Sequence, residues 1–385
     1  MKTGPSNADY PMLPGPARFI SDIAADIRAG KSVIVVFPDA AVESGSADAV
    51  LDDIAGDGPN TVFCEPSMDS FPTRIITTFG ADPVAMRAYD EWNSIIGWAA
   101  WHGSWVIVPS WQHQDVHDVV DRWPAQVQAC GLPVDDRPKL VLAVRLSELP
   151  RATTTHLDTS IVAVHWWWGV LDRLDTETRL AAVADRRINP VDAAVITELS
   201  GWDLECTDYL ASHWDRTTAG ASLAIDAYKR QDPTSCDGLS NSPSARRGVT
   251  APPVELEQAW REGLVDRWGY SIRWAPRTLD DKAIAQRIWM AHNRILIPHV
   301  EDERAHFEQL ILAKAAPRAL ADLDRRDDDI IEIGSLAWLL DTGRVNIGRD
   351  EGRRLKAFRD LRNALAHREP VADNLLRRIV HYLDF

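Results

Sequence analysis

Five short apolar runs constrain the fold of this chain more than any other feature of its sequence. They are bounded by turn residues and separated by stretches of helical periodicity, and they are Ser32–Phe37, Thr61–Cys64, Trp105–Val108, Leu140–Arg145 and Ile161–His165. Runs of this length without polar alternation are typical of strands that are buried on both faces. Because such strands alternate here with helical patterns, we predict an α/β domain with a mostly parallel sheet.

The periodicity divides the rest of the chain. Between residues 177 and 230 it becomes helical, which predicts a lid-like helical subdomain after the sheet, and residues 231–253 have the Ser, Pro and Gly content of a linker. We therefore place an irregular arm at 1–16, the α/β domain with its helical subdomain at 17–230, the linker at 231–253 and an all-helical bundle at 254–385. The predicted helices of the bundle are 254–268, 281–297, 300–314, 329–341, 349–368 and 372–383.

Composition excludes several classes of protein. The chain has 385 residues, 45% of them apolar, with a net charge of −15, as in a soluble globular protein that repels nucleic acid on average. Its four cysteines form no Cys-x-x-Cys pair, which argues against a disulfide framework or a zinc knuckle, so we expect no metal site and no cofactor. No apolar run approaches membrane-spanning length and no signal peptide is recognisable, so the expected location is cytoplasmic.

The most distinctive local pattern lies near the C-terminus, where Arg362-Asn363 is followed after three residues by His367. Apolar residues recur at helical spacing through this stretch, so one face of the predicted helix belongs to the core. Arg359, Asn363 and His367 fall on the other side at i, i+4 and i+8, with Arg362 beside them. Such a polar stripe can bind a phosphate and transfer a proton.

The surroundings of this pattern are basic although the chain as a whole is acidic. Residues 349–378 contain nine Lys and Arg against five Asp and Glu, which leaves a local charge of +4 where an RNA backbone could lie. A purely structural interpretation is also open, because Arg and His near the end of a helix interact favourably with its macrodipole.

The pattern Arg-Asn-x-x-x-His resembles the signature of the HEPN superfamily, many of whose members are metal-independent ribonucleases. Residues 330–340 look like the penultimate core helix of that family, and a helix at about 373–383 follows the motif, as a HEPN bundle requires. The resemblance implies a homodimer formed through the C-terminal domain, with a composite site and a product ending in a 2′,3′-cyclic phosphate. The implied catalytic residues are Arg362, Asn363 and His367, with Lys356, Arg359 and Arg368 as phosphate-guiding residues.

The chemistry of these residue types agrees with that assignment. Histidine changes charge near neutral pH, so His367 is the candidate general acid and base. The guanidinium of Arg362 matches two phosphate oxygens, and Asn363 can orient either the histidine or the phosphate. Arg362 and His367 are five residues apart and therefore point about 140° apart on a straight helix. One copy of the motif thus builds a poor site, which agrees with a composite site.

The N-terminal region resembles the P-loop ATPase modules of the AAA and STAND type, in which a helical lid follows an α/β sheet. Those modules need Gly-x-x-x-x-Gly-Lys-Ser/Thr directly after the first strand, because backbone amides and the lysine surround the phosphates. Residues 38–48 lack lysine and carry Asp39, Glu43 and Asp48 instead. Gly30-Lys31-Ser32 precedes the strand and does not replace the motif. We therefore expect no ATPase activity, and an unrelated α/β domain is the alternative interpretation.

The leading hypothesis from the sequence is a metal-independent HEPN-type endoribonuclease that acts on tRNA or mRNA. Proteins of this organisation are typical of toxin–antitoxin and antiviral defence systems, so we expect a regulatory protein partner and an N-terminal domain used for sensing or docking. The alternative is a non-enzymatic scaffold in a defence complex. The intact motif favours the enzyme, whereas the missing P-loop favours the scaffold. An active NTPase is a third hypothesis, which the acidic loop disfavours.

Overall fold

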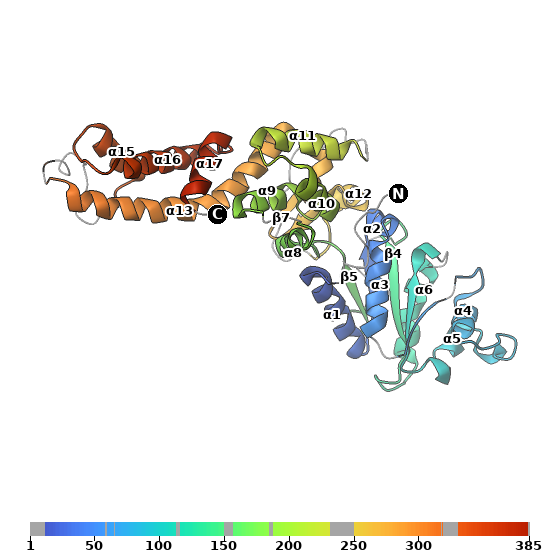
Figure 1. Ribbon diagram of the computed structural model, residues 1–385. Coiled ribbons are helices and arrows are strands. Elements are labelled where there is room, and N and C mark those ends of the chain that lie inside the picture. The colour runs from blue at the N-terminus through green and yellow to red at the C-terminus, as the bar shows by residue number, and fades with distance from the viewer. Residues whose placement is uncertain are drawn as a thin grey trace. The chain divides into compact units, whose positions relative to one another are not determined.

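The computed structural model describes residues 12–57, 60–64, 66–112, 116–149, 157–184, 188–231, 250–316, 318 and 330–383. The chain forms two compact units, one from residues 1–178 and 239–275 and the other from 179–238 and 276–385. Figure 1 labels the helices and strands of both units and colours them from the N-terminus (blue) to the C-terminus (red). Within the described ranges, no helix combines the length and the apolar character needed to cross a membrane.

The first unit is built on a five-stranded sheet whose strand order is β2-β3-β4-β1-β5. The strands are β1 (Ser32–Phe37), β2 (Thr61–Phe63), β3 (Trp105–Pro109), β4 (Lys139–Arg145) and β5 (Val162–Trp166). Every pairing is parallel, and Ile34 of β1 lies opposite Leu142 of β4 and Val164 of β5. The predicted α/β fold with a parallel sheet is therefore confirmed.

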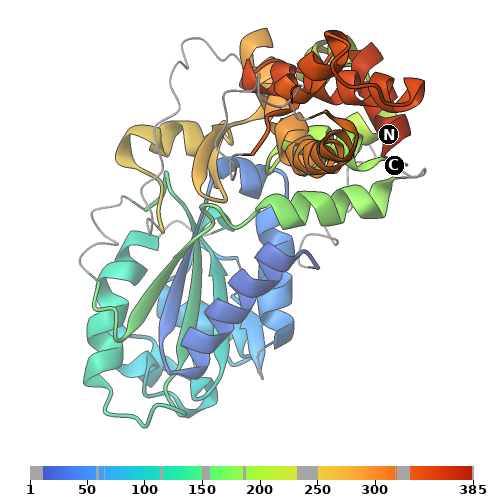
Figure 2. The same ribbon diagram turned by 90° about the vertical axis from the view of Figure 1, so that its left-hand side faces the viewer.

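Helices cover both faces of this sheet. They are α1 (Pro14–Arg28), α2 (Asp39–Glu43), α3 (Ser46–Asp57), α4 (Phe71–Thr78), α5 (Trp92–Ile95) and α6 (Val116–Ala129), and α8 (Arg173–Val183) leads into the second unit. Figure 2 shows α1 and α3 on one face and α6 on the other. The predicted arm is too long at its C-terminal end, because α1 begins at Pro14, a residue type suited to a first helical position. Residues 1–11 of that arm lie outside the described residues.

The segment predicted as the first helix of the C-terminal bundle, 254–268, is mostly not helical. It contains the short helix α12 (Glu257–Arg261), and then β6 (Val265–Trp268) forms an antiparallel hairpin with β7 (Ser271–Trp274). Gly269, at a φ of +62°, takes the first position of the two-residue turn, which Gly favours there. The hairpin belongs to the first unit, so the bundle does not begin at residue 254.

The described residues of the second unit form helices joined by loops and a short 3₁₀ turn. The helices are α9 (Pro190–Ser200), α10 (Leu204–His213), α11 (Thr218–Lys229), α13 (Asp281–Lys314), α15 (Ile333–Asp341), α16 (Arg349–Ala366) and α17 (Asp373–Tyr382). The predicted lid-like helices after the sheet belong here rather than with the sheet, because the apolar face of α9 packs along α13. The predicted boundary at 231–253 therefore differs from the structural division, and residues 232–249 of that linker lie outside the described residues.

Helix α13 is continuous over 34 residues, although two helices separated at Pro298 were expected. A proline inside a helix removes one backbone hydrogen bond and costs about 3 kcal/mol. The helix packs against α9, α15 and α16, and buried side chains such as Leu296, Val300, Phe307 and Ile311 lie on both sides of the proline. Tertiary packing along the whole helix outweighs the local cost.

Ser32 connects three elements of the first unit at a buried point. Its Oγ accepts hydrogen bonds from the indole Nε1 of Trp123 in α6, at 2.7 Å, and from the backbone N of Leu140 in β4, at 3.1 Å. Because the Ser32 side chain is buried, both donors depend on this one oxygen.

We predict that Ser32→Ala lowers the free energy of unfolding of the first unit by about 2 kcal/mol, since two buried donors lose their acceptor. Chemical denaturation followed by tryptophan fluorescence measures the change. The control is Ser21→Ala on the exposed face of α1, where a change within about 0.5 kcal/mol is expected. Equal stability of the two variants would contradict the assigned role of Ser32.

Candidate functional site: the exposed face and C-terminal end of helix α16

Helix α16 places the motif residues on the solvent side of the second unit. Its apolar positions, including Phe358, Leu361 and Leu365, are buried in the core that α16 shares with α13, α15 and α17. Arg362 and Asn363 lie on the opposite side and are exposed, as is His367, which directly follows the helix. The three motif residues are thus exposed in the structure, as the sequence predicts.

The end of α16 has a specific geometry. His367 is the C-cap residue, and Arg368 follows it at a φ of +59°. This is a left-handed backbone conformation that residues other than Gly rarely adopt. The N–H of Arg368 donates to Leu365 O and that of Glu369 to Ala364 O, which is the Schellman arrangement for ending a helix. The guanidinium of Arg368 lies 5.8 Å from the ring centroid of Trp289, so this predicted phosphate-guiding residue already contacts an aromatic ring.

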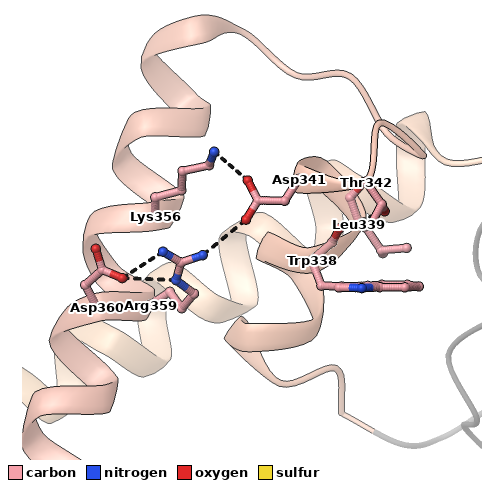
Figure 3. Close-up of polar contacts among 7 residues, drawn as sticks. All are labelled: Trp338, Leu339, Asp341, Thr342, Lys356, Arg359 and Asp360. Atoms are coloured by element: carbon pink, nitrogen blue, oxygen red, sulfur yellow. Dashed lines mark hydrogen bonds and ion pairs between the residues drawn. The ribbon is translucent and has the colours of Figure 1, made fainter.

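Two predicted phosphate-guiding residues are paired with a carboxylate. Asp341, at the end of α15, accepts from Lys356 Nζ at 2.5 Å and from Arg359 Nη1 at 3.2 Å, and Arg359 Nη2 also lies 2.8 Å from Asp360 Oδ1 (Figure 3). The hydrogen bond from the Lys356 ammonium lowers the pKa of Asp341 from its usual value. An RNA phosphate would therefore compete with Asp341 for both cations.

Arg362 is held more loosely. Its Nη2 lies 3.5 Å from the Oε2 of Glu332, and the two side chains are 44% and 67% exposed. An ion pair this exposed contributes little to stability, so the guanidinium of Arg362 can exchange Glu332 for a phosphate at small cost. Among the described residues, the side chains of Asn363 and His367 have no hydrogen-bond partner.

Sequence reasoning missed the acidic partners and an aromatic side chain beside them. Glu332 is the N-cap residue of α15 and Asp341 is the last residue of that helix. Because α15 runs antiparallel to α16, the two carboxylates meet different parts of α16. No spacing within the motif could reveal these partners. Trp338, on the exposed side of α15, is 40% exposed, and the guanidinium of Arg344 lies 4.4 Å from its ring centroid. Figure 3 shows Trp338 on the same helix as Asp341. Large exposed aromatic residues are enriched at interfaces.

A second polar cluster lies at the carboxyl ends of the central strands of the first unit. Asp39, the first residue of α2, accepts from Ser147 Oγ at 3.2 Å and pairs with Arg261 Nη2 at 3.2 Å. Parallel sheets commonly bind ligands at this edge, and a P-loop would begin after β1. The N-terminus of α2 is occupied here by the protein's own carboxylate, which is itself neutralised by an arginine from α12.

No family model and no curated protein matches the sequence. Among solved structures, the chain is similar to two variant forms of RuvB from Thermotoga maritima, each at 11% sequence identity and a TM-score of 0.27. One comparison covers 88% of this chain and 93% of the RuvB chain, and the other covers 86% and 84%. A likeness of this size carries no argument about function.

The turn after the motif is anchored by a buried histidine. His292 of α13 accepts a hydrogen bond from the backbone N of Val371 at its Nδ1, at 3.0 Å. Burial lowers the pKa of His292 to about 4, against an ordinary value of 6.5, because the protonated ring would lack the hydration that stabilises its charge in water. The unfolded chain therefore binds more protons than the folded chain between these two pH values.

We predict that the stability of the second unit decreases as the pH falls from about 6.5 to 4, with a contribution from His292 of about 3 kcal/mol when the pH passes below its folded pKa. His292→Asn keeps an acceptor near Nδ1 but does not titrate, so its unfolding free energy should be less dependent on pH. Denaturation series over this range, with exposed His381→Asn as the control, measure the difference. Parallel pH curves for wild type and His292→Asn would contradict the prediction.

Proposed function

We propose that this protein is a metal-independent endoribonuclease of the HEPN type, with Arg362, Asn363 and His367 as its catalytic residues. The observation that supports this most is the exposure of all three side chains on a helix whose other face is core. Among the described residues, the side chains of His367 and Asn363 form no hydrogen bond, so they remain accessible to a ligand. Their availability agrees with a role toward a ligand.

The proposed reaction is transesterification within RNA. The imidazole of His367 removes the proton from a 2′-hydroxyl, and the 2′-oxygen attacks the adjacent phosphorus. The guanidinium of Arg362, released from Glu332, stabilises the charge on the pentacoordinate phosphorane, and Asn363 orients the phosphate. The P–O5′ bond breaks, the 5′-oxygen receives a proton from an imidazolium, and the products carry a 2′,3′-cyclic phosphate and a 5′-hydroxyl.

A composite site in a homodimer fits this chemistry best. One imidazole must be neutral to act as the base and another must be protonated to act as the acid, and two motif copies related by a C₂ axis supply both. The exposed Trp338 on the neighbouring helix is suited to an interface of this kind. Arg368 remains a candidate phosphate-guiding residue, whereas the pairing of Lys356 and Arg359 with Asp341 weakens that role for them.

We further propose that the first unit serves for sensing or docking and does not hydrolyse ATP. The Asp39–Arg261 ion pair supports this, because a carboxylate stands where a P-loop would present a lysine and free amides. A non-enzymatic scaffold is the alternative for the whole protein, and the acidic partners of Lys356, Arg359 and Arg362 favour it, since they reduce the positive charge that RNA would meet.

We predict that purified protein cleaves RNA in the presence of EDTA and that His367→Ala and Arg362→Ala each reduce the rate by about 10²-fold or more, because a proton-transfer group or the phosphate clamp is lost. Both residues are exposed, so melting temperatures should change little. Gel analysis of labelled tRNA and mRNA fragments measures the rates, with Arg230→Ala, an exposed arginine directly after α11, as the matched control. Activity that requires a metal ion, or that survives in His367→Ala, would refute the assignment, and no cleavage with partners present would favour the scaffold.

We predict that the protein releases phosphate from Mg-ATP at no more than the uncatalysed rate, since Asp39 repels the triphosphate at the loop after β1. A malachite-green assay with the full chain measures this. The informative control is Asp39→Ala, which should stay equally inactive because no lysine is gained. Hydrolysis by the wild type that Asp39→Ala or Arg261→Ala abolishes would show that this edge of the sheet is an active nucleotide site.

A further inference from the structure

The first unit contains an open cavity of about 760 Å³ that is separate from the Asp39 cluster. One wall is the N-terminal half of α1, a second is the end of β5 with the loop that follows it, and a third is the turn of the β6–β7 hairpin. Figure 1 shows α1 beside β5, and the ring of Phe19 in α1 contacts His165 in β5 edge to face. The volume lies within the range of about 300–1,000 Å³ that is usual for small-molecule sites.

The buried side chains of Asp175 and Asp266 hold the walls of this cavity together. Asp175 accepts from the backbone N of Gly15, at the start of α1, and from that of Asp172, each at 2.7 Å. Asp266 accepts from the backbone N of Gly169 at 2.8 Å and from that of Arg267 at 2.7 Å. Each aspartate side chain thus joins the loop after β5 to another wall, so the cavity is largely preformed.

The same contacts position a guanidinium at the cavity. The side chain of Arg267 crosses Gly169, where an added Cβ would lie 2.3 Å from its Nε, and Arg267 Nη2 donates to Trp168 O at 3.4 Å. Gly169 has a φ of +68°, so the backbone and the contact both require a glycine there. The sequence therefore keeps a space that the arginine fills.

A second cation and exposed aromatic surface complete the lining. Arg18 of α1 is 67% exposed, and its guanidinium forms a long ion pair of 3.9 Å with Asp172 Oδ2, which a phosphate can replace. Tyr270, at the tip of the hairpin, is 90% exposed, and Trp166 of β5 also lines the cavity. Asp22 of α1 adds a carboxylate that can accept hydrogen bonds from hydroxyl groups.

We propose that this cavity binds a nucleoside phosphate. Arg18 on α1 and Arg267 on the hairpin both line the cavity and suit the phosphate, since guanidinium groups pair with phosphate oxygens through two parallel hydrogen bonds. The faces of Tyr270 and Trp166 suit a base, which stacks on aromatic rings, and Asp22 suits the ribose hydroxyls. The cations come from α1 and the hairpin, so this site needs no P-loop, and the proposal does not rest on ribonuclease activity.

Isothermal titration calorimetry of the full chain tests the proposal, with AMP, GMP, CMP and UMP as separate probes in magnesium-free buffer. We expect at least one nucleotide to bind, and we expect its parent nucleoside and ribose 5-phosphate each to bind at least about tenfold more weakly, because each lacks one half of the recognised chemistry. Failure of all four nucleotides to bind overturns the proposal. Equal binding of ribose 5-phosphate also overturns it, because the aromatic surface would then play no part.

Variants locate the site. Arg18→Gln and Arg267→Gln should each weaken binding by about tenfold or more, and Tyr270→Ala should weaken it by loss of stacking. The matched control is Arg87→Gln, an exposed arginine elsewhere in the first unit that should bind like the wild type. Thermal melts check folding, and Arg18 and Tyr270 are exposed enough that their variants should fold. Wild-type affinity in both Arg18→Gln and Tyr270→Ala would place any binding elsewhere and refute the assignment.

Discussion

The packing of α13 against its neighbours is the constraint on which the second unit depends. This helix runs without interruption past Pro298 and contacts α9, α11, α15 and α16 along its length. It also fixes the motif end of α16, because Trp289 Nε1 donates to Leu365 O at 2.8 Å and His292 holds the turn that follows. The position of His367 is therefore set by side chains of α13 as well as by α16 itself.

The strands could be predicted from the sequence because each is a short apolar run bounded by turn residues. Strands β1, β3 and β4 are buried almost throughout, whereas the edge strands β2 and β5 are only partly buried. The hairpin at 265–274 could not, since charged residues interrupt both of its strands and the preceding residues imitate a helical period. Gly269 was the local signal for a turn there. The continuity of α13 was also beyond sequence reasoning, because the local cost of Pro298 is visible in the sequence, whereas the packing that offsets it is not.

The candidate site shows the same division between local and long-range information. The exposure of Arg362, Asn363 and His367 follows from the helical period around Leu361, so the sequence predicts it. The carboxylates that pair with the neighbouring cations come from another helix, and only the structure brings Glu332 and Asp341 to them. These partners separate the basic residues into two groups: Lys356 and Arg359 are neutralised locally, whereas Arg362 is held by an exposed pair that a phosphate can replace.

Two aspartates of the first unit contact neighbouring arginines in different ways. At the edge where a P-loop would lie, Asp39 and Arg261 satisfy each other. At the cavity beside α1, buried Asp266 instead accepts from the backbone N–H groups of Gly169 and Arg267. Burial raises the pKa of Asp266 to about 8, because the ionised carboxyl would lose its hydration there. Asp39 thus pairs with the side chain of an arginine, whereas Asp266 accepts from the backbone of one.

We propose that the exposed end of α16 performs RNA transesterification without a metal ion. Mass spectrometry of the 3′ ends of fragments made by the wild-type protein in EDTA tests it most directly. We expect 2′,3′-cyclic phosphate ends with matching 5′-hydroxyls. Fragments with 3′-hydroxyl ends, or fragments that form only when a divalent metal is added, would contradict it.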